Sequence, residues 1–163
     1  MAMEPMGRIE IRPMTEGDLD EIMQIEWKSF PTPWSRRLFE RELLLPYAHA
    51  FVALEAPLDP VVGFLCFGLV EGEMHILNLA VHPERRRQGI GALLLRHGLD
   101  YCRGQGGREI TLEVRRSNYK AISLYRRFHF EPRGIRPHYY SDSGEDAVIM
   151  TLDLDDSGPL TAP

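Results

Sequence analysis

The sequence predicts a mixed α/β fold in one domain, with a central and mostly antiparallel sheet of about seven strands and about four helices. Two observations favour this class. Strand-like and helix-like segments alternate along the 163 residues without internal repeats or linkers. One helix, residues 90–103, lies between two strand-like segments, residues 74–81 and 109–115. Such a β-α-β crossover requires its two strands to be parallel neighbours.

The first elements are a short strand and two helices. Residues 8–12 alternate as a strand, and residues 15–29 read as an amphipathic helix with Thr15 as its cap. A second helix extends from a Ser35 cap to Leu45. The apolar period of the first helix is expected to include Leu19, Ile22, Met23, Glu26 and Trp27.

Three strands follow, at residues 48–54, 61–70 and 74–81, and they predict an antiparallel meander. The last two are joined by a turn at Glu71-Gly72-Glu73, where glycine permits the backbone conformation that tight turns need.

The second half of the chain completes the sheet. After the crossover helix and a turn at residues 104–107, residues 109–115 form a strand. Asn118 is expected to cap a helix that reaches His129, and two further strands are predicted near residues 130–137 and 147–154. The ordered core is expected to cover residues 8–154, with residues 155–163 as a flexible tail.

Composition excludes several classes. The chain is 44% hydrophobic and 26% charged, and it has neither a signal-peptide pattern nor an apolar run of bilayer length, so we expect a cytoplasmic protein with no membrane partner. Cys66 and Cys102 are too far apart in sequence for a C-x-x-C motif and are expected to be core residues. The six histidines show no ligand spacing, so no metal is implied.

Charge is unevenly distributed along the chain. Residues 1–81 hold six Lys or Arg against thirteen Asp or Glu, residues 82–140 hold thirteen against five, and residues 141–163 hold none against six, which gives the net charge of −5. The basic block contains the glycine-bearing loop. A solvated charged surface is one explanation, and a nucleic-acid patch is another. A compact polyanion fits a basic block in an acidic protein better than a duplex does, so we expect no direct nucleic-acid partner.

The loop Arg86-Arg87-Gln88-Gly89-Ile90-Gly91 lies directly before the crossover helix. Unpaired N–H groups at a helix N-terminus attract phosphate, and glycine lets the backbone come close to it. The loop lacks the third glycine of a dinucleotide-binding G-x-G-x-x-G and lacks Gly-Lys-Ser/Thr. On this pattern alone, an ordinary loop before a helix remains the alternative.

The spacing R-x-x-G-x-G after a strand resembles the coenzyme A signature of the GNAT superfamily of acetyltransferases. Further segments agree with its RimI-type members over roughly residues 8–154. These segments are Phe30-Pro31, Pro33-Trp34-Ser35, Asn78-Leu79-Ala80-Val81, Leu112-Glu113-Val114-Arg115 with Ser117-Asn118, Ala121-Ile122, Leu124-Tyr125, Phe128, Phe130, Arg136, Tyr139-Tyr140 and Glu145-Asp146-Ala147 with Ile149-Met150. The resemblance implies a GNAT fold, use of acetyl-CoA without a metal, and acetylation of the N-terminal alanine of a small-subunit ribosomal protein.

The resemblance also implies roles for particular residues. It implies that Glu113 is the general base and Tyr125 the acid that protonates the leaving thiolate. It implies that acetyl-CoA is bound by Leu79, Ala80, Val81, Arg86, Arg87, Gln88, Gly89, Ile90, Gly91, Ala92 and Asn118. The chain departs from the family pattern at the turn after the helix that Asn118 is expected to cap, where the family often has glycine and this chain has His129. We expect His129 to adopt the left-handed conformation or the turn to differ.

The residues themselves are compatible with this chemistry. Strand alternation sets Glu113 on the face opposite Leu112 and Val114, although a solvated strand glutamate would show the same pattern. Tyr125 lies on an apolar helical stripe, where a core tyrosine is equally expected, and a phenol stays protonated at neutral pH. Deprotonating an α-amine at pH 7 costs about 1.4 kcal/mol against about 4.6 kcal/mol for lysine, so a modest base acting through water suffices.

The acceptor site is less well defined by the sequence. Trp34, Tyr139 and Tyr140 are expected on loops that form a peptide groove, with plain packing as the alternative. Three functions therefore stay open: a protein N-terminal acetyltransferase, an acetyltransferase for a small amine or lysine, and a non-catalytic acyl-CoA-binding regulator. Glu113 with Tyr125 favours an enzyme, and the tyrosine pair favours a peptide acceptor.

Overall fold

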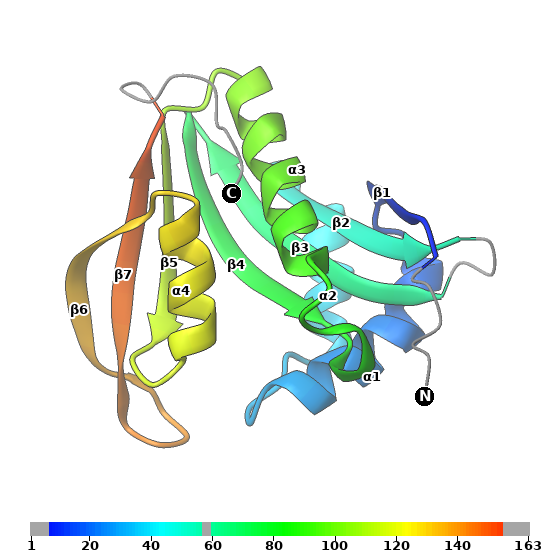
Figure 1. Ribbon diagram of the computed structural model, residues 1–163, viewed down its shortest axis with the longest axis horizontal. Helices are drawn as coiled ribbons and strands as arrows, with labels where there is room; N and C mark the ends of the chain where they lie inside the picture. Colours follow the sequence, from blue (N-terminus) through cyan, green and yellow to red (C-terminus); the bar gives the residue numbers. More distant parts are fainter. Residues whose placement is uncertain (1–6, 57–59, 155–163) are drawn as a thin grey trace. The chain divides into compact units, whose positions relative to one another are not determined.

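The computed structural model describes residues 7–56 and 60–154 and confirms the predicted fold class. Seven strands form one sheet with the hydrogen-bonded order β1-β2-β3-β4-β5-β7-β6, and four α-helices accompany it (Figure 1). The strands are β1 Ile9–Pro13, β2 Ala48–Glu55, β3 Val61–Val70, β4 Glu73–Val81, β5 Glu109–Arg115, β6 Glu131–Tyr140 and β7 Glu145–Asp153. The helices are α1 Leu19–Ser29, α2 Arg36–Leu44, α3 Ile90–Gly104 and α4 Tyr119–Arg127, with short 3₁₀ turns at Glu16–Asp18 and Pro83–Arg85.

The chain forms two compact units. Unit 1 contains the described residues up to Cys66 together with Asn78–His97, and unit 2 contains Phe67–Leu77 and the described residues from Gly98 onward. The chain passes between them within β3, β4 and α3. The predicted tail, residues 155–163, lies outside the described residues.

The core of unit 1 is built by α1, α2 and the strands β2 and β3. Phe39 of α2 is completely buried and meets Phe64 of β3 edge to face, with ring centroids 5.6 Å apart. Leu19, Ile22, Met23 and Glu26 are buried as predicted, whereas Trp27 is 67% exposed. The prediction for Trp27 was wrong because the buried face is centred between Ile22 and Glu26, and Trp27 is rotated by about 100° from Glu26, past the edge of that face at Met23.

Unit 2 contains the parallel pair that the crossover predicted. The β4–β5 register runs from Glu73 opposite Glu109 to Ile76 opposite Leu112. Strand β5 alternates between buried and half-buried residues along its whole length, so one face packs into the core and the other carries the polar side chains. On its other side, β5 pairs antiparallel with β7, which pairs with β6 at the edge of the sheet (Figure 1).

The geometry of the hairpin between β3 and β4 accounts for the glycine at position 72. The connecting residues Glu71 and Gly72 have φ values of 51° and 82°. Two successive positive φ values characterise the type I′ turn, whose twist matches that of the flanking strands. The turn predicted at this position is therefore confirmed, and it is two residues long.

His129, two residues after the end of helix α4, has the left-handed conformation, with φ 72°. The His129 N–H donates to the Arg126 carbonyl at 2.9 Å, and the Phe130 N–H donates to the Tyr125 carbonyl at 3.1 Å. These two bonds define a Schellman motif, which usually includes an apolar contact between the residues that flank it. Tyr125 and Phe130 supply that contact, with ring centroids 5.6 Å apart. The first of the two expected outcomes at His129 is therefore confirmed.

Replacing His129 by glycine is expected to stabilise the protein, because a non-glycine residue in the left-handed region costs about 1 kcal/mol that glycine avoids. The matched control is Arg127→Gly, two residues earlier and still helical, which is expected to lower the free energy of unfolding by about 0.5–1 kcal/mol. Urea denaturation measures both. A loss of stability in His129→Gly would contradict this account of the turn.

Candidate active site

The glycine loop has the backbone geometry that a phosphate site requires. Gly89 has φ 80°, and a Cβ atom built on it would meet nothing within 4 Å, so the loop leaves open space at this position. Helix α3 begins at Ile90, and the Leu93 N–H is already bonded to the Gly89 carbonyl at 3.0 Å. The preceding N–H groups lie before the first intrahelical bond and point out of the helix. This end of α3 can therefore receive an anion.

Arg86 has a structural role beside the loop. Its Nε donates to the Val81 carbonyl and its Nη2 donates to Ser29 Oγ, both at 3.0 Å. These bonds attach the beginning of the loop to the end of β4 and the end of α1. Arg87 is exposed and has φ 63°, a strained value that fixes the loop in a bent conformation.

The segment Leu79–Val81 forms the last part of β4. The recorded pairing of β4 with β5 ends at Ile76, although β4 continues to Val81. Ala80 is buried, whereas Leu79 and Val81 are half-buried. Their side chains therefore belong partly to the core, as expected for strand residues in any fold.

A buried carboxylate fixes Trp34. Glu26 is 1% exposed; it accepts a hydrogen bond from Asn78 Nδ2 at 2.8 Å and another from the Trp34 backbone N–H at 2.9 Å. Burial raises the pKa of Glu26, and the two hydrogen bonds oppose that rise. Trp34 itself packs on the core with its ring 5.1 Å from Phe39. Its side chain thus has a packing role within unit 1.

Unit 2 contains the other predicted site residues, and Glu113 is their centre. Its Oε2 accepts a hydrogen bond from His75 Nε2 at 2.6 Å, and its Oε1 lies 3.4 Å from Arg136 Nε. The side chain of Glu113 is 9% exposed, whereas those of His75 and Arg136 are 46% and 55% exposed. The hydrogen bond from His75, assisted by the charge of Arg136, lowers the pKa of Glu113 although burial opposes it. We call these three residues the carboxylate cluster.

The phenols of Tyr125 and Tyr140 both have raised pKa values. Tyr125 is 7% exposed, and burial, with a contribution from Tyr140, raises the pKa of its phenol. Burial also raises the pKa of Tyr140 to about 12, and Glu113 contributes to that rise. Both phenols therefore carry their protons at neutral pH and can donate them. Tyr139 is 49% exposed, and its ring meets that of Tyr140 edge to face at 5.1 Å.

Asn118 has the predicted cap role, because its Oδ1 accepts the Ala121 N–H at 3.2 Å. His75, Arg136 and the contacts of Arg115 were not predicted as parts of the site. The histidine was considered only as a metal ligand. Its position in the carboxylate cluster depends on the β4–β5 register, which no local pattern specifies.

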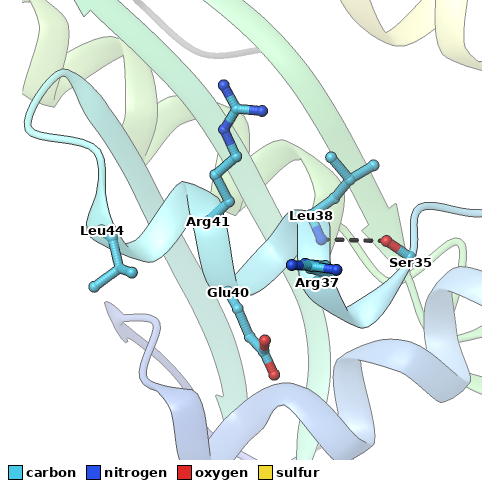
Figure 2. Close-up of a pocket in the computed structure, with 6 residues that line it drawn as sticks. All are labelled: Ser35, Arg37, Leu38, Glu40, Arg41 and Leu44. Atoms are coloured by element: carbon cyan, nitrogen blue, oxygen red, sulfur yellow. Dashed lines mark hydrogen bonds between the residues drawn. The ribbon is translucent and has the colours of Figure 1, made fainter.

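A separate hollow of about 460 Å³ lies against α2 and contains none of the predicted site residues (Figure 2). Figure 2 shows Leu38 and Arg41 on one side of the helix, Glu40 on the other, and the Ser35 cap that begins it. The hollow is lined by Ser35, Arg37, Leu38, Glu40, Arg41 and Leu44. Within residues 7–56 and 60–154, no group of His, Cys, Asp or Glu is arranged to hold a metal ion. No helix in the same ranges is long and apolar enough to cross a membrane.

The carboxylate cluster predicts how two substitutions change the pKa of Glu113. Because the His75 hydrogen bond favours the charged form, His75→Phe is expected to raise the pKa of Glu113, and by more than Arg136→Met does. Carboxyl-carbon NMR titration of the parent and both variants measures these values. Equal shifts in the two variants, or none in His75→Phe, would contradict the geometry.

The same shift predicts a pH dependence of stability. A carboxyl group whose pKa is lowered in the folded state stabilises the fold above its unfolded-state pKa, and this stabilisation is lost as the pH falls through the folded-state value. As the pH falls below about 4.3, the free energy of unfolding of the parent is therefore expected to decrease relative to that of Glu113→Gln. Urea denaturation across this range provides the measurement.

Comparison with known proteins agrees with the geometry. The sequence model of the Acetyltransferase (GNAT) family matches residues 19–130. A relative from Bacillus subtilis (strain 168) is 38% identical over 147 residues, which cover 90% of this chain and 96% of the relative. The "[Ribosomal protein bS18]-alanine N-acetyltransferase" of Escherichia coli (strain K12) is 34% identical over 139 residues, which cover 84% of this chain and 92% of that protein.

Solved structures give the same result. The crystal structure of the ribosomal-protein-S18-alanine N-acetyltransferase from Escherichia coli aligns with a TM-score of 0.83 and 31% identity, covering 96% of this chain and 100% of that one. Ard1 from Thermoplasma volcanium aligns with a TM-score of 0.81 and 29% identity, covering 89% and 97%. The phosphate-site geometry of the glycine loop, the sheet order and these similarities lead to one conclusion: the chain belongs to the GNAT family of acetyltransferases.

Proposed function

We propose that this protein is a cytoplasmic N-alpha-acetyltransferase that transfers the acetyl group of acetyl-CoA to the N-terminal alanine of a small-subunit ribosomal protein. The observation that carries the proposal is the carboxylate of Glu113, which is nearly buried and is held by His75 and Arg136. A regulator that only binds acyl-CoA does not need a carboxylate positioned to accept a proton. The names of the relatives support the choice of acceptor.

The residues of unit 1 fit acetyl-CoA. The open space at Gly89 and the free N–H groups at the start of α3 suit a pyrophosphate, and we assign this role to Arg86–Ala92. The backbone of Leu79, Ala80 and Val81 lies beyond the recorded β4–β5 ladder and can bond the pantetheine arm as an added strand would. Asn118, which belongs to unit 2, is assigned a contact with the cofactor in addition to its role as the N-cap of α4. Acetyl-CoA supplies the acetyl group as a reactive thioester.

The residues of unit 2 are assigned the proton transfers. Glu113 is ionised at neutral pH, as a glutamate with or without a lowered pKa would be, so it can accept a proton from the acceptor ammonium through water. The low pKa makes it a weak base, which is sufficient for an α-amine with a pKa near 8. Tyr125 is assigned the acid role, since its raised pKa keeps the phenol protonated until the thiolate leaves.

The acceptor is assigned to the tyrosine pair of unit 2, whereas Trp34, the third residue predicted for this role, packs on Phe39 in unit 1. Tyr139 is half-exposed at the end of β6 and offers an aromatic surface to a peptide. The preference for an α-amine over lysine rests on the lower cost of deprotonating the α-amine.

Tyr125→Phe is expected to bind acetyl-CoA as the parent does and to lose about ten- to a thousand-fold in kcat, because the ring packing is retained and the proton donor is removed. Tyr119→Phe is the matched control, since Tyr119 lies on the same helix and is 78% exposed. Calorimetry and steady-state kinetics give the two quantities. Parental turnover in Tyr125→Phe would make Tyr125 a core residue only.

A peptide that begins with a free alanine and contains lysine is expected to be acetylated on its α-amine. Deprotonating that amine costs roughly 3 kcal/mol less than deprotonating the lysine side chain. Mass spectrometry locates the acetyl group, and an N-terminally blocked copy of the peptide is the control. Acetylation of the lysine, or an equal rate with the blocked peptide, would replace the proposal with a lysine or small-amine acetyltransferase.

A further inference from the structure

Arg115 binds the loop between β6 and β7 from the neighbouring strand. Its guanidinium forms a bidentate ion pair with Asp142, with distances of 3.0 Å from Nη1 to Oδ1 and 2.7 Å from Nη2 to Oδ2. The same group lies 4.0 Å from the centroid of the Tyr140 ring, a cation–π distance. Nη1 also lies 3.7 Å from Glu145 Oε1. The side chains of Arg115 and Asp142 are only 19% and 21% exposed, so solvent screens their pairing weakly.

These contacts place Arg115 on the catalytic face of unit 2. On β5, residues 111, 113 and 115 share one face because side chains alternate along a strand, so Arg115 and Glu113 point to the same side. Tyr140, which Arg115 covers, interacts electrostatically with Glu113 and Tyr125. A planar guanidinium can bind a carboxylate with two hydrogen bonds and cover an aromatic ring, which a lysine ammonium cannot do with the same geometry.

Further bonds attach the loop at the same end of β5. The Ser117 N–H donates to Glu145 Oε2 at 2.7 Å, and the Gly144 N–H donates to the Tyr140 carbonyl at 2.7 Å. Without Arg115, the carboxylates of Asp142 and Glu145 would lose the guanidinium they share, and Tyr140 would lose the group that covers its ring. The loop would then keep its other bonds, among them those of His138 to Asp146 and to the Gly144 carbonyl, but it would lose its attachment to β5 through Arg115.

We propose that Arg115 is a positioning residue for the acceptor: by binding Asp142 and covering the Tyr140 ring, it holds the β6–β7 loop in the conformation that receives the acceptor peptide. This inference rests on the proposed function, because it takes the tyrosine pair as the acceptor site. It assigns Arg115 no contact with acetyl-CoA and no proton transfer. Its loss therefore affects acceptor binding selectively.

The test compares Arg115→Met and Arg115→Lys with the control Arg116→Met, whose parent residue is 67% exposed and makes one ion pair at 3.7 Å with Asp146. Arg115→Met is expected to raise the KM for the alanine peptide about tenfold and to leave the KM for acetyl-CoA within about twofold. Arg115→Lys is expected to restore part of the loss, and Arg116→Met to match the parent. Equal changes in both KM values, or no change for the peptide, would overturn the proposal.

Hydrogen exchange of the amides of residues 139–146, measured without any substrate, separates this inference from the proposed function. Exchange is expected to accelerate in Arg115→Met and to stay parental in Arg116→Met. Unchanged exchange in Arg115→Met would overturn the proposal even if the parent acetylates alanine peptides. If the parent acetylates only another amine, the proposed function fails, while the exchange rates and the KM for that amine still decide the role of Arg115.

Discussion

The parallel pairing of β4 with β5 is the constraint on which the candidate site depends. Parallel neighbours cannot be joined by a tight turn, so the chain must return to the start of β5 through a crossover, and α3 with its glycine loop is that return. The same pairing sets His75 opposite Thr111, two residues before Glu113, which lets the imidazole reach the carboxylate. A single pairing thus accounts both for a helix N-terminus suited to phosphate and for the hydrogen bond that lowers the pKa of Glu113.

Two carboxylates with opposite environments show how the fold separates structural from chemical roles. Glu26 is buried among neutral donors, Asn78 and the Trp34 N–H, and its pKa is raised. Glu113 has a cationic or hydrogen-bonding neighbour at each oxygen, and its pKa is lowered. When the surroundings of two carboxyl groups shift their pKa values in opposite directions, the two groups are suited to different tasks. Glu26 organises the segment that contains Trp34, and Glu113 is the residue that we propose as the general base.

Local patterns in the sequence were enough to predict most elements. The boundaries of β3 and β5 agree with the predicted residues 61–70 and 109–115, because period-two alternation and the flanking turns define them. The caps at Ser35 and Asn118 were predicted for a similar reason, since their side chains act on the backbone within three residues. Trp27 was misplaced because the width of a buried helical stripe depends on what packs against it. The carboxylate cluster could be predicted only in part, because His75 and Arg136 reach Glu113 from other strands whose register is a tertiary property.

The edge strand β6 has features that bear on how the protein behaves in a crowded solution. A free sheet edge is a template for pairing with other chains, and β6 is the last strand of the sheet with residues 131–139 exposed. Pro132 and Pro137 have no N–H to donate, and the register with β7 shifts twice along the strand. His138, with φ 53°, bends the backbone further from an ideal strand. An interrupted edge of this kind resists addition of a foreign strand, so the exposure of β6 need not make the protein prone to aggregation.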